Sequence, residues 1–333
     1  MIEWSESQQA IREMVQKFVK EEIVPKIPQL EHGDLPPYEV LRKMFAAFGM
    51  REMGKMRAEK AVARAKKKEE ARARGEELPA KEERIQSGDE VAMQMIPIIE
   101  LSRYCPGLVT ALGVSVGLTV NTIMARGTAR QIERWAEALL SLEKIGAWAI
   151  TEPGSGSDAF GAMKSTARRT DNGYLLNGSK TFITNGPYAD HIVFICKLDE
   201  PGIEPANRKV LSFVLDKGMK GLTQSKPLKK MGLHSSPTGE LFLDDVFVEK
   251  DRLLGETEEV SYRTGAKDTF TAERTGVASM ALGIIEECLR LCTDYAKTRV
   301  QFGRPIAEFQ DHSRRRSCGA GWPRDGDVER ASV

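Results

Sequence analysis

The sequence predicts an α+β fold in which helical segments precede and follow a central β region. Three observations support this prediction. Apolar residues recur at helical spacing in the first 145 residues, short β-rich runs with turn sequences fill about residues 146–250, and a long helical pattern follows Phe270. Because the strands are gathered in one block, helices and strands form separate regions. The β block is too short to hold a Rossmann unit.

The composition is that of a soluble globular protein. The chain has 333 residues, enough for two or three domains, and its formal net charge of +1 gives no field for nucleic acid or an anionic membrane. The first residues lack the basic start and apolar run of a signal peptide, and the apolar stretches are short of a membrane span.

The cysteines point to a reducing, cytoplasm-like compartment, because the chain has five of them and no CxxC pair. Cys288 and Cys292 stand one helical turn apart, so they could ligate a metal. No histidine lies nearby to complete such a site, and we therefore expect these two cysteines to pack in the core.

The N-terminal region reads as helical. Ser5 and Gln8 form a plausible capping box before an apolar face that includes Ile11 and Phe18. Composition then shifts, and residues 51–90 are dominated by Lys, Arg, Glu and Ala. This charged insertion is interpreted as a solvated helix or a mobile segment, with a partner-docking arm as the alternative. Helical periodicity resumes at residues 91–140.

The β region carries clear strand and turn signals. Hairpin-type turns are expected at Asp171-Asn172-Gly173 and at Asn177-Gly178. Further strands are expected at residues 191–197, 210–216 and 240–248. The helix expected after them has a long apolar face, formed by Val277, Met280, Ala281, Ile284, Cys288, Leu291 and Tyr295.

We divide the chain into an N-terminal helical domain (1–145), a central β domain (146–255), a partial C-terminal helical domain (256–310) and an atypical tail (311–333). The tail has no periodicity and almost no large apolar residues. One hypothesis is that it is out-of-frame or foreign sequence, so that the natural C-terminal end is missing. The alternative is a natural disordered tail.

The strongest chemical signal is the stretch Ala149–Gly161, where a strand runs into a loop of Gly and Ser. Small residues let backbone N–H groups and hydroxyls approach a phosphate or a flavin edge closely, although such a loop alone is more often a tight turn. It is not a P-loop, because the Gly-Lys-Ser/Thr ending is absent.

This stretch resembles the signature of the acyl-CoA dehydrogenase family. Three further motifs of that family follow in order, at Lys180–Gly186, Met231–Thr238 and Arg299–Ile306. The resemblance is strong over about residues 145–310. It implies a FAD enzyme that desaturates an acyl-CoA thioester by abstracting the α proton and transferring the β hydride to flavin N5. The family fold has an N-terminal helical domain, a central β domain and a C-terminal helical bundle, which is incomplete here.

The resemblance also assigns site residues. Its β-domain loop would line the flavin and thioester with Trp148, Ile150, Thr151 and Ser157. Phe182 would pack on the isoalloxazine and Thr184 would donate to flavin N5, where a preorganised donor stabilises developing negative charge. The alternative for Phe182 and Thr184 is an ordinary alternating strand.

At the end of the chain, Arg299 would reach the FAD pyrophosphate of a neighbouring subunit, with Phe302 and Gln310 near the adenosine half. A guanidinium suits phosphate oxygens, but Arg299 alone would more often be a surface charge near a helix end.

The catalytic base is assigned by the same resemblance. One subgroup of the family, which includes isovaleryl enzymes, places its glutamate on a central helix before an arginine, and this position reads Glu273-Arg274 here. Glu273 is the expected base, with Thr271 and Arg274 at the substrate. The alternative is that Glu273 lies in the first turn of a helix capped by Thr271, where an acid complements the dipole. No metal ligands are expected.

The implied partners are an acyl-CoA substrate, an electron-transfer flavoprotein as acceptor, and further copies of the chain in a homodimer or homotetramer of the full-length form. A cytoplasmic location is expected, with no nucleic acid and no membrane span. Two alternatives remain at this point: an acyl-CoA oxidase or flavin monooxygenase of the same fold, and a truncated remnant without activity.

Overall fold

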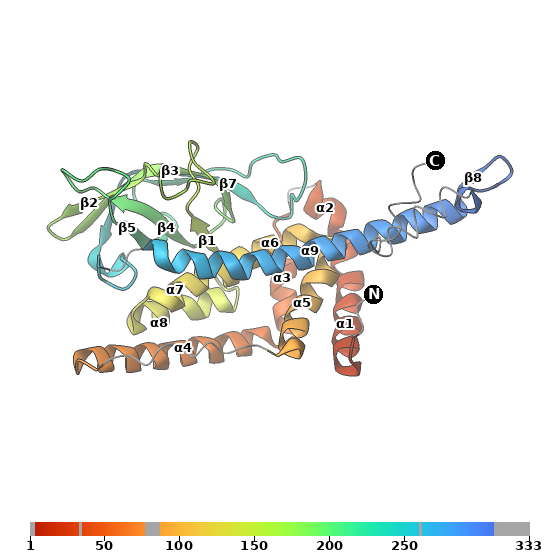
Figure 1. Ribbon diagram of the computed structural model, residues 1–333, viewed down its shortest axis with the longest axis horizontal. Helices are drawn as coiled ribbons and strands as arrows, with labels where there is room; N and C mark the ends of the chain where they lie inside the picture. Colours follow the sequence, from red (N-terminus) through yellow and green to blue (C-terminus); the bar gives the residue numbers. More distant parts are fainter. Residues whose placement is uncertain (1–3, 33–34, 77–86, 260–261, 310–333) are drawn as a thin grey trace, which may run out of the picture.

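The computed structural model describes residues 4–32, 35–76, 87–259 and 262–309, with side chains for all of these except residues 262–275. Helices come first along the chain, a seven-stranded sheet follows, and then come the long helix α9 and a small hairpin (Figure 1). This arrangement confirms the predicted α+β fold with a central β domain. The helices of the N-terminal region lie on one side of the sheet, and α9 runs between the two (Figure 1).

The first helices form a cluster around one apolar core. They comprise α1 (Glu6–Phe18), the π-helical turn η1 (Val19–Ile23), the 3-10 turn η2 (Val24–Lys26), α2 (Ile27–Glu31) and α3 (Tyr38–Ala47). Ser5 and Gln8 form the expected capping box of α1. Ile23, Leu41 and Phe45 are almost fully buried in this core, so the apolar face predicted for these helices is the face that packs.

The charged stretch after Gly49 begins with a continuous helix, α4 (Met50–Ala73). It lies along α8 (Ala129–Leu140), with Ala58 buried and Gly54 against the backbone of Leu140. The Glu69 carboxylate accepts a hydrogen bond of 2.7 Å from the Ala129 amide and so caps α8. Residues 50–73 are therefore a solvated helix that packs on the N-terminal helices, and the expectation of a mobile segment is wrong for this part.

The remaining helices of the N-terminal region approach the sheet. They are α5 (Gly88–Ser102), α6 (Pro106–Leu112), the π-helical segment η3 (Gly113–Thr119), α7 (Val120–Arg126) and α8. The run Pro106–Arg126 is long and apolar enough to cross a membrane by length and composition, contrary to the sequence expectation. Leu108, Val120 and Ile123 in this run are fully buried in the protein core, which is the position of a core helix.

The sheet has the order β1-β4-β2-β3-β7-β6, and β5 pairs with β4. Its strands are β1 (Gly146–Ala149), β2 (Thr166–Thr170), β3 (Gly173–Thr184), β4 (His191–Leu198), β5 (Val210–Asp216), β6 (Leu222–Gln224) and β7 (Thr238–Glu249). The three strands expected from the sequence at β4, β5 and β7 are confirmed. The turn at Asp171-Asn172-Gly173 also joins β2 to β3 as expected.

The expected turn at Asn177-Gly178 is wrong, because β3 runs straight through it. The pairing of β3 with β7 shifts register there, and Asp245 is the extra residue on β7, with a φ of 45°. The side-chain oxygen of Asn177 accepts a hydrogen bond of 2.9 Å from the Asp245 backbone N–H, and its side-chain nitrogen donates one of 2.8 Å to the Asp245 carboxylate. Gly178 has a φ of 146°, and a Cβ there would collide with Ser165. The Asn-Gly pair thus serves a bulge rather than a turn.

Asn185, directly after β3, joins the sheet to the helices. It is fully buried, has a φ of 63°, and its amide nitrogen donates to the carbonyls of Ala111 on α6 and Gly146 on β1. Its side-chain oxygen accepts a hydrogen bond of 3.0 Å from Tyr38 on α3. Burial raises the pKa of Tyr38, so its hydroxyl stays protonated and able to donate.

Helix α9 (Tyr262–Thr298) begins before the predicted start at Phe270 and extends beyond the rest of the molecule (Figure 1). It packs on α5 through small residues, because Gly283 touches the backbone of Ile99 and Ser279 is buried. The predicted apolar face is largely exposed instead, with Leu291 and Tyr295 at 52 and 60% exposure. Core packing of Cys288 and Cys292 is likewise wrong, since both are exposed.

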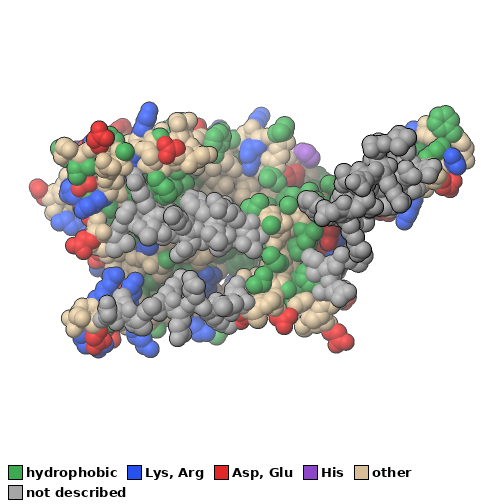
Figure 2. Space-filling model, viewed as in Figure 1, with side chains coloured by type: hydrophobic (Ala, Val, Ile, Leu, Met, Phe, Trp, Pro, Cys, Tyr) green, Lys and Arg blue, Asp and Glu red, His purple; other side chains and the backbone are tan. Residues whose placement is uncertain are grey.

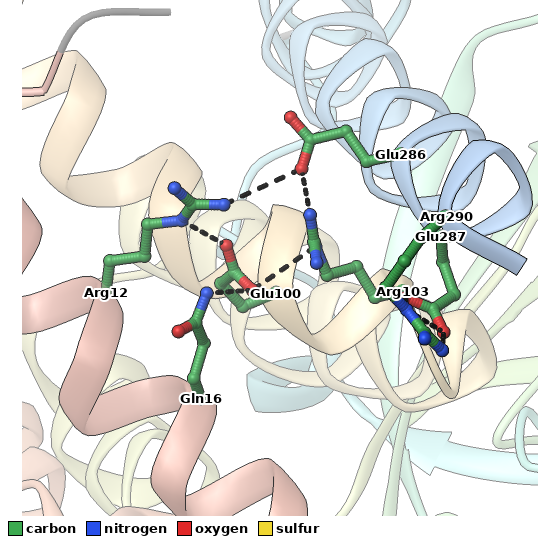
Figure 3. A network of polar contacts seen from close by, with 7 residues as sticks. All are labelled: Arg12, Gln16, Glu100, Arg103, Glu286, Glu287 and Arg290. Atoms are coloured by element: carbon green, nitrogen blue, oxygen red, sulfur yellow. Dashed lines mark hydrogen bonds and ion pairs between the residues drawn. The ribbon is translucent and has the colours of Figure 1, made fainter. Parts of the chain in front are cut away.

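A polar network fixes the crossing of α1, α5 and α9 (Figure 3). Glu100 on α5 is 2% exposed and receives hydrogen bonds from Arg12 at 2.5 Å and Gln16 at 3.0 Å. Arg103, one turn further along α5, pairs with Glu286 on α9 at 2.5 Å. The buried Glu100 carboxylate is thus satisfied by two groups of α1, and Arg103 ties in α9 through Glu286.

Candidate active site

The loop after β1 is held in place from beneath by a buried ion pair. Lys180 on β3 is fully buried, and its ammonium group donates to the Ile150 carbonyl at 3.0 Å and to Glu152 at 2.9 Å. The Glu152 carboxylate also accepts from the amides of Lys164 and Ser165. Burial opposes ionisation of Glu152, but Lys180 and these donors hold its pKa below the usual range. The loop is therefore anchored at both of its ends.

Phe182 and Thr184 follow this anchor on β3. Between the Lys180–Leu241 and Ile183–Gly239 pairs, two residues of β3 face one residue of β7, which is a β-bulge. Phe182 in the bulge has a φ of 56° and is 68% exposed, an unusual combination for an aromatic residue. Thr184 is half-buried at the end of the strand, opposite Thr238. An ordinary alternating strand, the alternative for this segment, would not give the positive φ of Phe182.

The structure brings the β-domain candidates together. The Thr181 amide, next to Phe182, donates to the Thr151 carbonyl at 3.0 Å. Trp148 and Ile150 are buried at the end of β1 and beyond it, while Thr151 is half-buried. Ser157 is exposed on the loop. The β1 loop and the β3 bulge, the two parts of this candidate surface, are thus joined by a backbone hydrogen bond.

Glycines in the loop test whether a flat cofactor fits here. Neither Gly154 nor Gly156 has a φ in the left-handed region, and a Cβ on either would meet nothing closer than 4.0 Å in the chain. Nothing inside the described chain therefore requires glycine at these positions, whereas a bound group close to the backbone would. The exposed ring of Phe182 offers a stacking surface nearby, so the residues present fit a flavin.

The Arg-x-x-Phe-Gly motif lies elsewhere. Arg299 is exposed at the end of α9, and Phe302 and Gly303 form the turn of a small hairpin, β8 (Val300–Gln301) and β9 (Arg304–Pro305). Phe302 is 94% exposed. The 3-10 turn η5 (Ile306–Glu308) follows. This hairpin lies at the far end of α9, well away from β3 and the β1 loop (Figure 1). The structure does not bring Arg299 and Phe302 together with Phe182 in one chain.

The base candidate lies inside α9. Because the helix begins at Tyr262, Glu273 follows about three turns of helix. The interpretation of Glu273 as a first-turn residue capped by Thr271 is therefore wrong. The side chains of Thr271, Glu273 and Arg274 lie outside the described residues, as does Gln310.

Three supporting residues were missed by the sequence reasoning: Lys180, Glu152 and Asn185. A signal for Lys180 was present, because a lysine at a buried position of an alternating strand needs a buried partner. Asn185 carried no signal of its own, since its partners come from α3, α6 and β1.

Comparison with known protein families agrees with this architecture. Residues 5–59 match the N-terminal domain of acyl-CoA dehydrogenases, residues 147–246 the middle domain and residues 264–316 the C-terminal domain. The acyl-CoA dehydrogenase of Bacillus subtilis is 34% identical over 92% of this chain and 72% of its own length.

Two further relatives match shorter stretches. The short-chain specific acyl-CoA dehydrogenase of Megasphaera elsdenii is 38% identical over 68% of this chain. Isovaleryl-CoA dehydrogenase of Arabidopsis thaliana is 35% identical over 65% of this chain. The matches cover 58% and 51% of these two relatives, so the chain spans little more than half of their length.

Solved structures share the fold. Butyryl-CoA dehydrogenase from Megasphaera elsdenii superimposes with a TM-score of 0.75 and 30% identity, over 96% of this chain and 76% of that one. An acyl-CoA dehydrogenase from Bacillus anthracis complexed with FAD superimposes with a TM-score of 0.74 and 27% identity, over 96% of this chain and 49% of that one. A structure from work on the electron transferring flavoprotein of Acidaminococcus fermentans superimposes with a TM-score of 0.74 and 30% identity, over 95% of this chain and 75% of that one. Together with the β1 loop and the β3 bulge, these matches show that the chain belongs to the acyl-CoA dehydrogenase family.

Proposed function

We propose that this chain binds FAD and desaturates an acyl-CoA thioester between its α and β carbons. The observation that carries the proposal is the strained, exposed Phe182 beside a loop whose glycines the chain itself does not need. Bound FAD would supply the two-electron oxidant for the β carbon. The family and its relatives support the reaction class.

The β-domain residues have distinct roles in this proposal. Phe182 stacks on the ring system and Thr184 offers a hydroxyl donor where negative charge develops. Trp148, Ile150 and Thr151 line the thioester side and exclude water, while Ser157 contacts the exposed edge. The Lys180–Glu152 pair holds both segments at a fixed spacing, because it bonds to the loop and to β3 at once.

Glu273 is the proposed base for the α proton, with Thr271 and Arg274 at the thioester. A carboxylate buried against an apolar acyl chain has a raised pKa, which suits proton abstraction near neutral pH. Its position inside α9 supports this role over a helix cap, because an interior carboxylate has no free N–H groups to cap.

Arg299 and Phe302 are proposed to complete the cofactor site of a second copy, with Gln310. The geometry supports an oligomer, because α9 holds these residues at its far end, and a helix of 37 residues is about 55 Å long. The dimer or tetramer, the electron-transfer flavoprotein as acceptor and the cytoplasmic location all belong to this proposal.

The first test is anaerobic mixing of the purified full chain with a panel of acyl-CoA thioesters, followed by the visible flavin absorbance. Bleaching that is lost in Glu273→Gln, with flavin content unchanged, supports both the reaction and the base. A retained flavin that no thioester reduces contradicts the proposal, as does a protein that cannot be loaded with FAD.

A mixing experiment tests the contribution of the second copy. Arg299→Ala and Glu273→Gln chains, each inactive alone, are unfolded, mixed and refolded together. Since a mixed dimer holds one site with both residues intact, random pairing restores about a quarter of the activity. If the mixture stays inactive while refolded wild type recovers, Arg299 does not act across subunits.

A further inference from the structure

A basic groove lies between α4 and α7, outside the candidate active site. It encloses about 950 Å³, within the range of small-molecule sites. Its lining includes seven basic side chains and one acidic one among the described residues. The basic residues are Arg57, Lys60, Arg64, Lys67, Lys68, Arg72 and Arg126. Blue side chains gather along α4 at the lower left of Figure 2.

The cations of α4 stand on one face of the helix. From Arg57 they follow at spacings of three or four residues, through Lys60, Arg64 and Lys68 to Arg72. Like charges at this spacing repel one another and destabilise a helix. No ion pair joins the last four of them to an acidic side chain within the described part of the chain. Within the described residues, this repulsion is therefore not offset by a paired carboxylate.

The acidic residue in the groove does not neutralise this charge. The Glu69 carboxylate accepts the Ala129 amide at the start of α8, where it complements the helix dipole. Arg57 is directed across the groove and donates to Asn121 on α7 at 2.6 Å. Burial lowers the pKa of Lys68, and the charges of Arg72 and Arg64 lower it further. The groove thus carries positive side chains on one wall, and Lys68 is partly buried among them.

The floor of the groove is apolar. Ala61, Ala65 and Met124 line it and also pack against the core cluster that contains Trp135. A ligand matched to this surface has anionic groups for the basic wall and a flat or apolar part for the floor.

We propose that the groove between α4 and α7 binds a small ligand that carries adenosine and two or more phosphate charges. Arginine and lysine on one wall match phosphate oxygens, and the alanine and methionine floor matches a base. The concave shape favours a small molecule over an acidic protein or a nucleic acid, which would need an open surface. Two sources share this chemistry: a free nucleotide, and the nucleotide end of a CoA thioester.

Calorimetric titration of the full chain tests the proposal with four probes: inorganic pyrophosphate, ADP, adenosine 3′,5′-bisphosphate and CoA. The Arg64→Ser/Lys68→Ser variant is expected to weaken binding at least about tenfold, because it removes two cations that would contact phosphate oxygens. Lys66→Ser is the matched control, since Lys66 lies on the other flank of α4 beside Glu133 and Glu137. It is expected to bind like wild type.

The probes separate the two sources. Tighter binding of ADP than of the bisphosphate and CoA indicates a free nucleotide, and the reverse order indicates the nucleotide end of CoA. The proposal fails if wild type binds none of the probes, if the double variant binds like wild type, or if only heparin, RNA or an acidic peptide binds. Should the double variant not fold, Lys60→Gln replaces it with the same expected direction.

Discussion

At Phe182 the chain holds an aromatic side chain in the left-handed backbone region with 68% of its surface exposed. Each of these features costs free energy in the isolated protein, and strain of this kind concentrates at functional sites. The bulge that creates it depends on Lys180 and on the Thr181–Thr151 hydrogen bond. The buried lysine therefore stabilises the conformation that the exposed ring needs.

Replacement of Phe182 tests this cost. Asn tolerates a positive φ, so Phe182→Asn is expected to leave the free energy of unfolding within about 0.5 kcal/mol of wild type or to raise it. Flavin affinity is expected to fall by about tenfold with the loss of the ring. Urea unfolding and the flavin-to-protein ratio measure the two effects. Phe247→Asn, at a 47% exposed position of β7, serves as the control and should keep its flavin.

Glu258 gives a pH-dependent contribution to stability. Hydrogen bonding to Arg169, at 2.5 Å, and to Tyr174 holds its pKa below the ordinary value of 4.5, although burial opposes this. Folding therefore favours the ionised form, and the contribution is complete above the ordinary pKa and lost as pH falls through the lower folded value.

The difference in free energy of unfolding between wild type and Glu258→Gln is expected to narrow as the pH falls. Wild type is expected to be the more stable protein at about pH 6, and the gap in the free energy of unfolding should shrink towards about pH 3. Urea unfolding across this range measures it. A gap that stays constant with pH would show that Glu258 acts through packing alone.

At the scale of the element, α4 owes its position to a close approach. A Cβ on Gly54 would lie 2.9 Å from the Leu140 carbonyl oxygen on α8. Alanine improves helix propensity by about 1 kcal/mol relative to glycine, but this contact forces the two helices apart. Gly54→Ala is thus expected to lower the thermal midpoint.

A second glycine provides the comparison. Gly117 lies in the helical run Pro106–Arg126 with no atom within 4 Å of its would-be Cβ. Gly117→Ala is expected to keep or raise the midpoint, since only the propensity gain applies. If both variants behave alike, the approach of α4 to α8 does not depend on Gly54.

The sequence predicts elements well where their signals are local. The strands at β4, β5 and β7 and the capping box at Ser5 were predicted because alternation and capping depend on adjacent residues. The prediction of a turn at Asn177-Gly178 is wrong because Asp245, the bonding partner of Asn177, lies on another strand. The prediction that the apolar face of α9 packs is wrong because α9 packs on α5 through small residues such as Gly283, which carry no apolar signal.

The candidate site divides in the same way. The β1 loop and Phe182 could be located by their motif, whereas the positive φ and exposure of Phe182 arise from pairing with β7. The lysine and glutamate beneath the loop could not be paired from the sequence, since buried partners are set by the tertiary fold.

At the scale of the whole molecule, Glu100 controls how three helices meet. Glu100→Ala removes the hydrogen-bond acceptor of Arg12 and Gln16. It also removes the carboxylate that forms an ion pair with Arg103 (Figure 3). Loss of one partner from a buried pair costs about 3–5 kcal/mol in general, so a large loss of unfolding free energy is expected. Urea unfolding measures it.

Glu22 offers a surface comparison in the same region. It pairs with Lys26 and Lys43 on the outside of the N-terminal helices, where exposed ion pairs contribute little. Glu22→Ala is therefore expected to unfold close to wild type. A similar loss in both variants would mean that the network at Glu100 adds nothing beyond an ordinary surface pair.

The side chain of Asn185 has a consequence for how the protein comes apart. One buried amide is bonded to α3, α6 and β1, and its backbone N–H bonds to Pro237 at 2.7 Å. The helical region and the sheet cannot open separately without leaving this buried amide short of hydrogen-bond partners. Amide protons in both should therefore exchange with solvent through one shared opening event, and a protease should release no stable middle fragment, although the sequence divides the chain into domains there.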